Sequence, residues 1–184
     1  MAKVGRILGY DVPAEGYREL YGEEQLEKYD LIFRNSMIDL GGVELVLDVG
    51  CGIGLLREYL RELGFDGLYI GLDILEDRIM EARKNCDHGS DLILADAHHL
   101  PFRDQGFDLV ALITVAHLLR MESSLKELER VSKRILIITI LKGLKFSATK
   151  LSKIIKRLMS NWRVTTLDKP WIKDLVYILV RRRD

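Results

Sequence analysis

The chain has 184 residues, of which 48% are apolar, and its 28 Lys and Arg balance 28 Asp and Glu. This length and composition are typical of one soluble globular domain with a sizeable core, rather than of a disordered chain. The first residues lack the pattern of a signal peptide, no apolar run reaches membrane-spanning length, and the only cysteines are Cys51 and Cys86. We therefore expect a cytoplasmic protein without a disulfide framework or a zinc site.

The N-terminal part reads as an irregular segment followed by a helix. Glycines and a proline recur through residues 1–22, which predicts irregular structure there. Apolar residues at helical spacing predict a helix from Glu23 to Leu40, ended by the glycine pair that follows. We expect residues 1–40 to form a cap segment on a single domain that spans residues 1–184.

A glycine turn between a strand and a helix is the most informative stretch. The apolar residues 45–49 predict a strand, three alternate glycines follow as Gly50, Gly52 and Gly54, and residues 55–63 have helical spacing. Such a turn is where an α/β sheet binds a nucleotide-like ligand. The spacing differs from the G-x-G-x-x-G pattern of dinucleotide sites, and Asp48 just before the turn favours a cationic ligand over a pyrophosphate.

The next strand ends in a second carboxylate. Residues 67–74 form a short apolar run that terminates in Asp73 and Ile74, about 20 residues past the glycines. A carboxylate at that position accepts hydrogen bonds from ribose hydroxyls in nucleotide-binding α/β folds. Asp73 can equally serve as the N-cap of a helix over residues 76–85, and the two roles are compatible.

Two further strands carry the remaining motifs. Residues 91–95 and 107–115 read as strands, and between them lies Ala95-Asp96-Ala97 followed by Leu100-Pro101-Phe102. Together with Asp48-x-Gly50-x-Gly52-x-Gly54, this order of motifs resembles the class I S-adenosylmethionine (SAM) methyltransferases. The resemblance extends over residues 23–184 and implies SAM as the cofactor.

The resemblance implies a role for each matching residue. Asp48, with the turn at Gly50, Cys51 and Gly52, would hold the methionine end; Asp73 and Ile74 would hold the ribose, and Asp96 and Ala97 the adenine. Thr114 is expected beside the cofactor, and Tyr29, Thr114, His117 and Lys145 on the acceptor side. His117 could act as a general base, because an imidazole can take a proton near neutral pH, or it could pack under the cofactor. His98 and His99 are expected to border the adenine, and we predict no metal.

The C-terminal part completes the predicted sheet. Residues 124–131 and 147–160 read as helices, residues 134–141 as a buried strand, and residues 162–167 and 173–181 as strands that can pair as an antiparallel hairpin. The predicted fold is therefore one Rossmann-like, doubly wound α/β domain. Its seven-stranded sheet is mostly parallel, with an antiparallel last strand.

The charge is unevenly distributed. Residues 142–184 hold twelve Lys and Arg against three Asp, a net charge of +9, and residues 1–141 carry −9. This favours an RNA partner that contacts the basic stretch, or simply a solvated basic face. Glu19-Leu20-Tyr21 and Lys28-Tyr29 also resemble the lead-in of rRNA guanine-N7 methyltransferases, which work with a small activator subunit. Alternatives are a small-molecule or protein methyltransferase, and a SAM-binding subunit without catalysis of its own.

Overall fold

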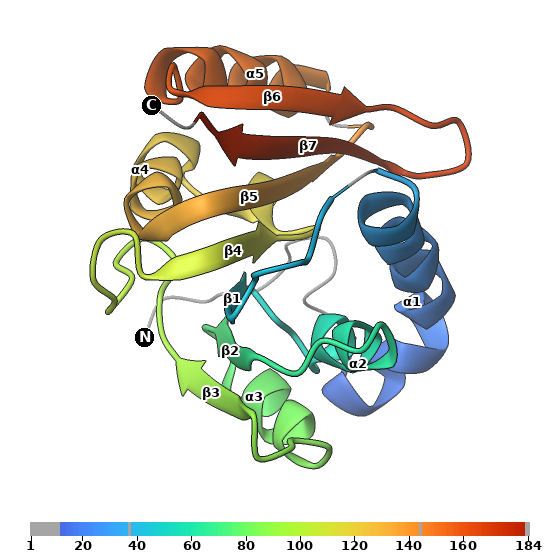
Figure 1. Cartoon of the computed structure of the whole chain (residues 1–184). Helices are drawn as coiled ribbons and strands as arrows, with labels where there is room; N and C mark the ends of the chain where they lie inside the picture. The colour runs from blue at the N-terminus through green and yellow to red at the C-terminus, as the bar shows by residue number, and fades with distance from the viewer. Residues whose placement is uncertain (1–11, 37, 144, 183–184) are drawn as a thin grey trace.

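The computed structural model of the chain describes residues 12–36, 38–143 and 145–182, and the side chains of residues 145–147 lie outside that description. Its elements alternate between strand and helix over most of the chain (Figure 1). They are α1 (Ala14–Tyr29), η1 (Asp30–Arg34), β1 (Leu45–Val49), α2 (Leu55–Glu62), β2 (Leu68–Asp73), α3 (Glu76–Arg83), β3 (Ser90–Leu94), β4 (Phe107–Leu112), η2 (Ala116–Leu118), α4 (Met121–Val131), β5 (Ser132–Leu141), α5 (Lys145–Leu158), β6 (Trp162–Leu167) and β7 (Asp174–Arg181).

The seven strands form one sheet in the order β3-β2-β1-β4-β5-β7-β6. The pairs from β3 to β5 are parallel, and β7 is antiparallel to both β5 and β6. The predicted α/β fold and the antiparallel hairpin at the end of the chain are confirmed. Because the strand order reverses between β1 and β4, the carboxyl ends of these strands mark the crevice where such sheets bind ligands.

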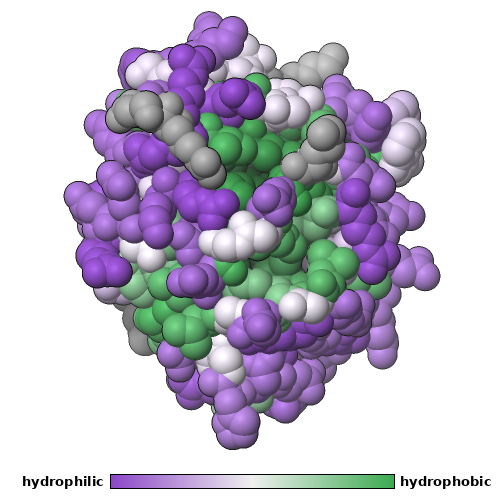
Figure 2. Space-filling model, viewed as in Figure 1, coloured by the Kyte–Doolittle hydropathy of each residue, from purple (hydrophilic) through white to green (hydrophobic). Residues whose placement is uncertain are grey.

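Two apolar layers cover the sheet. On one face α1, η1 and α2 pack through Ile32, Phe33, Leu56 and Leu60; on the other, α4 and α5 pack through residues such as Leu128. Figure 2, which views the molecule as Figure 1 does, shows hydrophobic residues in the middle of the visible face and hydrophilic ones around them. Among the described residues, no helix is long and apolar enough to cross a membrane.

The first helix begins earlier than the sequence predicts. The prediction of irregular structure over residues 1–22 is wrong from Ala14 onward, and residues 1–11 lie outside the described residues. Pro13 precedes the helix, where its missing N–H costs nothing, and Gly16 and Gly22 are accommodated inside it. Each glycine disfavours a helix by only about 1 kcal/mol, which tertiary packing readily offsets. The predicted helix to Leu40 ends instead at Arg34, after the π-helical turn η1.

The buried side of the helix is only partly the predicted apolar one. Tyr29, Ile32 and Phe33 of the expected apolar side are buried, as predicted, but Leu26 is 46% exposed, and the polar residues Gln25 and Lys28 are buried. An amphipathic pattern assumes that the buried side is apolar. That assumption fails for α1, because part of its buried side is polar and meets polar groups of the sheet.

Candidate functional site

The glycine turn joins β1 to α2 through three left-handed residues. Gly50, Gly52 and Gly54 have φ angles of 75°, 54° and 86°, a region that residues with a side chain rarely adopt. The N–H of Gly50 donates to the carbonyl of Leu72 over 2.6 Å, which fixes the turn to the end of β2. A Cβ added at Gly50 would lie 2.5 Å from Cγ2 of Val115. The close approach that excludes a side chain at Gly50 is therefore made by the protein itself.

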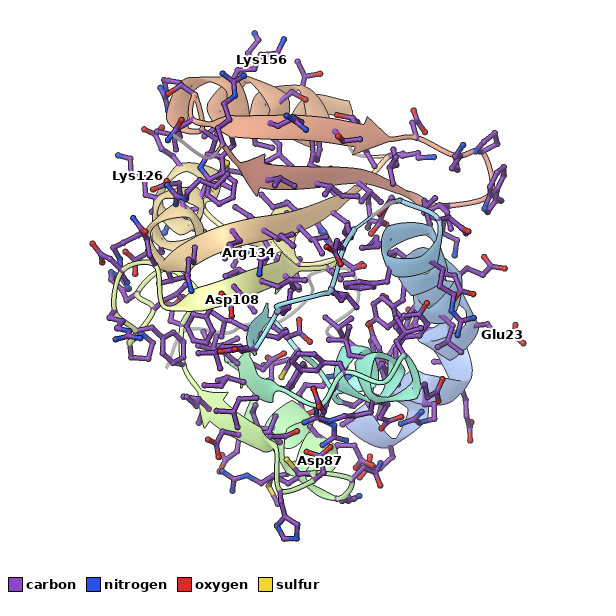
Figure 3. The ribbon with its side chains drawn as sticks, viewed as in Figure 1. Glu23, Asp87, Asp108, Lys126, Arg134 and Lys156 are labelled. Atoms are coloured by element: carbon purple, nitrogen blue, oxygen red, sulfur yellow. The ribbon has the colours of Figure 1, made fainter. Side chains whose placement is uncertain are left out.

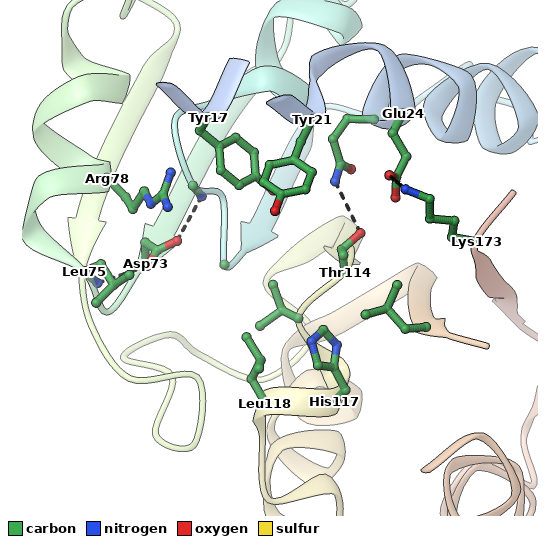
Figure 4. Close-up of a pocket in the computed structure, with 15 residues that line it drawn as sticks. Tyr17, Tyr21, Glu24, Asp73, Leu75, Arg78, Thr114, His117, Leu118 and Lys173 are labelled. Atoms are coloured by element: carbon green, nitrogen blue, oxygen red, sulfur yellow. Dashed lines mark hydrogen bonds and ion pairs between the residues drawn. The ribbon is translucent and has the colours of Figure 1, made fainter. Parts of the chain in front are cut away.

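A cavity of about 240 Å³ lies between this turn, α1 and η2 (Figure 4). Tyr17 and Tyr21 of α1 form one wall and His117 forms the opposite one. An ion pair between Glu24 of α1 and Lys173 crosses its end. The other lining residues are Gln25, Gly50, Gly52, Asp73, Leu75, Arg78, Thr114, Val115, Leu118 and Leu141. We call this the α1 cavity.

A second cavity of about 210 Å³ continues along the ends of β2 and β3. Asp96 and Ala97, the residues predicted to hold the adenine, line it together with Ile74. It shares Gly50, Asp73, Val115 and Leu118 with the α1 cavity. We call it the β3 cavity. The two cavities meet beside the glycine turn and together offer an elongated site.

Asp73 stands where the two cavities meet and is 9% exposed. Its Oδ2 accepts from the N–H of Gly52 over 2.9 Å, and its Oδ1 accepts from the N–H of Leu75 over 3.0 Å. Burial raises the pKa of this carboxyl above its usual range, although these N–H groups counteract the rise. The predicted role as a helix N-cap is wrong, because Leu75 occupies the N-cap position of α3 and no side chain caps that helix. Asp73 instead orders the segment before α3 and also faces the site, so its predicted role towards a ribose stays a prediction.

Asp96 belongs to a chain of hydrogen bonds that runs to α4. Its Oδ1 lies 2.5 Å from Nδ1 of His98 and accepts from the N–H of His98 over 2.9 Å. The N–H of Arg120 donates to Nε2 of His98 over 3.0 Å, so Nε2 carries no proton and Nδ1 carries one. Burial opposes ionisation of Asp96, but the contacts with His98 lower its pKa overall. The sequence places His98 beside the adenine residues but gives no sign of its link to α4.

His117 is half-buried on the wall of the α1 cavity. Neither ring nitrogen has a hydrogen-bond partner among the described residues, and both are buried. Burial lowers the pKa of the imidazole; Asp174 opposes this shift and Lys28 adds to it. His117 is therefore neutral at pH 7 and has hydrogen-bonding capacity left for a ligand.

A buried polar network that the sequence analysis missed supports the floor of the site. Nζ of Lys28 lies 2.9 Å from Asp174 Oδ2, and neither side chain is exposed to solvent. Lys28 also donates to Oγ1 of Thr114 over 2.6 Å, and Thr139 donates to Asp174 over 2.6 Å. The N–H of Thr114 donates to Thr139 over 2.7 Å. These bonds hold Thr114 at a φ of 60°, an unfavourable conformation for a β-branched residue, between β4 and η2.

Three predicted site residues lie elsewhere, and a fourth cannot be placed from the described residues. Asp48 and Cys51 are buried below the glycine turn and are absent from the linings of both cavities. Tyr29, predicted on the acceptor side, is 5% exposed and packs against Tyr59 in the core, with ring centroids 5.4 Å apart. The side of α1 that borders the α1 cavity carries Tyr21, Glu24 and Gln25 instead. Lys145 is the first residue of α5, and its side chain lies outside the described residues.

Asp48 differs most from its expected role. The hydroxyl of Tyr69 donates to Asp48 Oδ2 over 2.6 Å, and both side chains are buried. Desolvation raises the pKa of Asp48 to about 7, with Tyr69 opposing the rise and Asp73 adding to it. A carboxyl with so high a pKa is partly protonated at neutral pH, which weakens the argument that its charge attracts a ligand's ammonium group.

Comparisons with known protein sequences identify the domain. A family model described as a methyltransferase domain matches residues 47–137. Over 112 residues the chain is 34% identical to the fatty-acid O-methyltransferase of Mycolicibacterium smegmatis, a match that covers 59% of this chain and 41% of that protein. Over 85 residues it is 36% identical to the phthiotriol/phenolphthiotriol dimycocerosates methyltransferase of Mycobacterium tuberculosis, covering 45% and 30%. The chain spans less than half the length of either relative.

Solved structures share the fold across most of the chain. A SAM-dependent methyltransferase from Aquifex aeolicus superposes with a TM-score of 0.63 at 20% identity, over 90% of this chain and 92% of that one. A Haloferax volcanii putative methyltransferase, solved in complex with the Trm112 methyltransferase activator, gives a TM-score of 0.65 at 14% identity, over 94% and 99%. At these identities the likeness shows the fold alone.

Proposed function

The chain belongs to the class I SAM-dependent methyltransferases, and from this premise we propose that it transfers the methyl group of SAM to a small acceptor held in the α1 cavity. The observation that carries the proposal is the pair of connected cavities, with Asp73 where they meet, Asp96 in the β3 cavity and His117 in the α1 cavity. Cavities of this kind at the switch point of an α/β sheet suit a nucleoside ligand with an elongated tail.

The residues present fit this cofactor. The β3 cavity offers an apolar slot with a carboxylate at its edge, which suits an aromatic base with an exocyclic amine. Asp73 can accept hydrogen bonds from ribose hydroxyls, and the positive-φ turn leaves room for the methionine part. Bound SAM supplies a methyl carbon made electrophilic by its sulfonium.

The residues around the acceptor then have two tasks. The first is alignment, because holding two reactants in line can lower a barrier by about 7–11 kcal/mol. The second is removal of a proton when the attacking atom is a hydroxyl or an amine. As the nucleophile–carbon bond forms and the carbon–sulfur bond breaks, neutral His117 can take the proton that the nucleophile loses.

A small acceptor fits the structure better than RNA. The wall that α1 builds with Tyr17 and Tyr21 covers one side of the cavity. Several basic residues of the C-terminal stretch form ion pairs within the molecule, including Lys142 with Asp168, Arg157 with Glu122 and Arg181 with Glu129. The curated relatives named above are a fatty-acid and a phthiotriol/phenolphthiotriol dimycocerosates methyltransferase, neither described as acting on RNA.

RNA is the second candidate because α5 carries cations that form no ion pair with another described residue. Lys153 and Lys156 are exposed there, away from the linings of the two cavities. The RNA candidate includes an activator subunit as a further partner, by analogy with the Haloferax volcanii protein that was solved in complex with one. The third possibility is a subunit that binds SAM for a catalytic partner.

One labelling experiment separates these candidates. The protein is incubated with methyl-labelled SAM and an extract of the source organism, and the products are fractionated into small molecules, RNA and protein. We expect label in the small-molecule fraction. Label in a nuclease-sensitive fraction would replace the small acceptor by RNA. Absence of label, with SAM bound, would assign the chain to the non-catalytic role.

Replacing Asp73 with Ala should weaken SAM binding by at least about tenfold, the equivalent of about one charge-assisted hydrogen bond. The ribose hydroxyls would lose their acceptor, and Gly52 would lose the group that fixes its N–H. Calorimetric titration with SAM measures the effect, and a melting curve checks the fold. Unchanged affinity in a folded variant would remove Asp73 from the site.

Replacing His117 with Ala should leave SAM affinity unchanged and slow methyl transfer by about 100-fold, the lower range for a general base. The matched control is His88→Ala, which removes an exposed histidine from the loop between α3 and β3, outside the linings of both cavities. Transfer is measured on the acceptor fraction that wild-type protein labels. Equal rates for His117→Ala and wild type would make His117 a structural residue.

A further inference from the structure

A third cavity, of about 670 Å³, lies on the other side of His117, at the start of α4. His117 and Leu119 line it, and Arg120, Lys126 and Lys150 supply cationic side chains from α4, its preceding residue and α5. We call this cavity the α4 basin. His117 lines both the α4 basin and the α1 cavity, so its side chain lies between the two.

The described side chains that line the α4 basin carry more positive than negative charge: Arg120, Lys126 and Lys150 against Glu122. Glu122 lies 2.9 Å from a guanidinium nitrogen of Arg157 and 3.8 Å from Nζ of Lys126. A hydrogen bond from Arg157 lowers the pKa of Glu122, and the charges of Lys126 and Lys150 lower it further. Glu122 is therefore ionised, and the positive charges of Arg157 and Lys126 balance its negative charge. The positive charges of Arg120 and Lys150 can then attract an anionic ligand in the basin.

The start of α4 adds to this potential. Arg120 occupies the N-cap position, and no side chain caps the helix by a hydrogen bond. The first N–H groups of a helix favour negative charge, and the adjacent cations act in the same direction. The backbone of Arg120 is held by His98, which is bonded to Asp96 in the β3 cavity. The α4 basin is therefore linked to the β3 cavity by hydrogen bonds and is part of the same site.

We propose that the α4 basin binds the anionic group, a carboxylate or a phosphate, of the methyl acceptor, while the rest of the acceptor reaches the α1 cavity past His117. The inference rests on the proposed function and names its substrate class: a small amphiphilic organic anion. Leu119 and Met121 beside the cations give the basin an apolar part that suits the body of such a molecule. The buried, unpartnered nitrogens of His117 lie between the anion site and the cofactor.

The test uses protein saturated with S-adenosylhomocysteine and three probes of equal chain length: octanoate, octyl phosphate and neutral octanol. Binding is followed by calorimetry and by the NMR signals of the His117 ring. At least one of the two anions should bind at least about tenfold more tightly than octanol, as expected for a charge-assisted contact. Both anions should shift the His117 signals, and the tighter one identifies whether the site prefers carboxylate or phosphate.

Two double variants locate the site. Arg120→Gln with Lys150→Gln should remove the preference for the anions and keep the affinity for SAM. The control, Lys153→Gln with Lys156→Gln, also removes two positive charges, but from α5 residues outside the lining of the basin. Figure 3 shows Lys156 pointing outward from α5. This control should keep the preference for anions over octanol. SAM affinity, measured first on each sample, separates failure of this proposal from failure of the proposed function.

Three results would overturn the proposal: equal binding of octanol and the two anions, an anion preference that survives the Arg120→Gln and Lys150→Gln changes, or anion binding without any change at His117. Binding of a short oligoribonucleotide that displaces the small anions and is lost in the same variant would replace the small acceptor by RNA.

Discussion

Replacing Lys28 with Met should lower the free energy of unfolding by about 3–5 kcal/mol, the range for removing one partner of a buried ion pair. Lys28 is fully buried, and its Nζ contacts Asp174 and Thr114. Met fills a similar volume but leaves the Asp174 carboxylate without its cation. Urea unfolding at pH 7 measures the loss.

The matched control for this variant is Lys84→Met, which breaks an exposed ion pair with Glu81 on α3. That change should have little effect, because solvent screens exposed pairs. Adding Asp174→Leu to Lys28→Met should recover part of the lost stability, since the uncompensated charge is then gone. Equal losses for Lys28→Met and Lys84→Met would contradict the interpretation of the network as a buried ion pair.

The same network bears on the site, because it fixes Thr114 in its left-handed conformation. Thr114 lines the α1 cavity and lies three residues before His117. We therefore expect Lys28→Met to alter the structure of the α1 cavity around Thr114 and His117 more than that of the β3 cavity. The buried pair also explains why α1 turns polar residues towards the sheet.

Replacing Asp48 with Asn should make the protein's stability less dependent on pH between about 4 and 7. In the unfolded chain this carboxyl ionises near pH 4, whereas in the folded protein desolvation raises its pKa to about 7. Between these values the folded state binds more protons, so the wild type loses stability as the pH rises. The stabilisation that protonated Asp48 contributes is fully present below about pH 4 and is lost once the pH has risen through 7. The corresponding change in the free energy of unfolding is about 4 kcal/mol.

Urea unfolding at pH 5 and pH 8 tests the direction of this pH dependence of stability. Asn retains an acceptor for the hydroxyl of Tyr69, so Asp48→Asn should gain stability relative to wild type at pH 8. Asp66→Asn, which changes an exposed carboxylate, is the control for surface effects. Parallel pH profiles for wild type and Asp48→Asn would show that Asp48 ionises as freely in the folded protein as in the unfolded chain.

The parts of the site that sequence predicts are those set by local chain geometry. Gly50 and Gly52 are recognisable because a left-handed turn after a strand requires glycine, and Asp73 and Asp96 because they end neighbouring parallel strands. Strand and helix alternation likewise predicts the sheet and its final hairpin.

The parts that sequence does not predict depend on contacts between distant segments. Lys28 and Asp174 lie on α1 and β7, and nothing in either local pattern indicates that they pair. Tyr69 reaches Asp48 because β1 and β2 pair in parallel with Asp48 opposite Gly71, a register that no single strand reveals. Tyr29, expected on the acceptor side, lies in the core, and Tyr21 and Gln25 are the nearby α1 residues that line the cavity instead.

The most direct test of the account is a calorimetric titration of the wild-type protein with SAM, repeated with S-adenosylhomocysteine. We expect saturable binding of one molecule per chain, competition between the two ligands, and chemical-shift changes at Ala97 in the β3 cavity and at Gly52 in the α1 cavity. Failure of both ligands to bind, with the protein folded, would contradict the assignment of the β3 cavity and of the glycine-turn end of the α1 cavity to the cofactor.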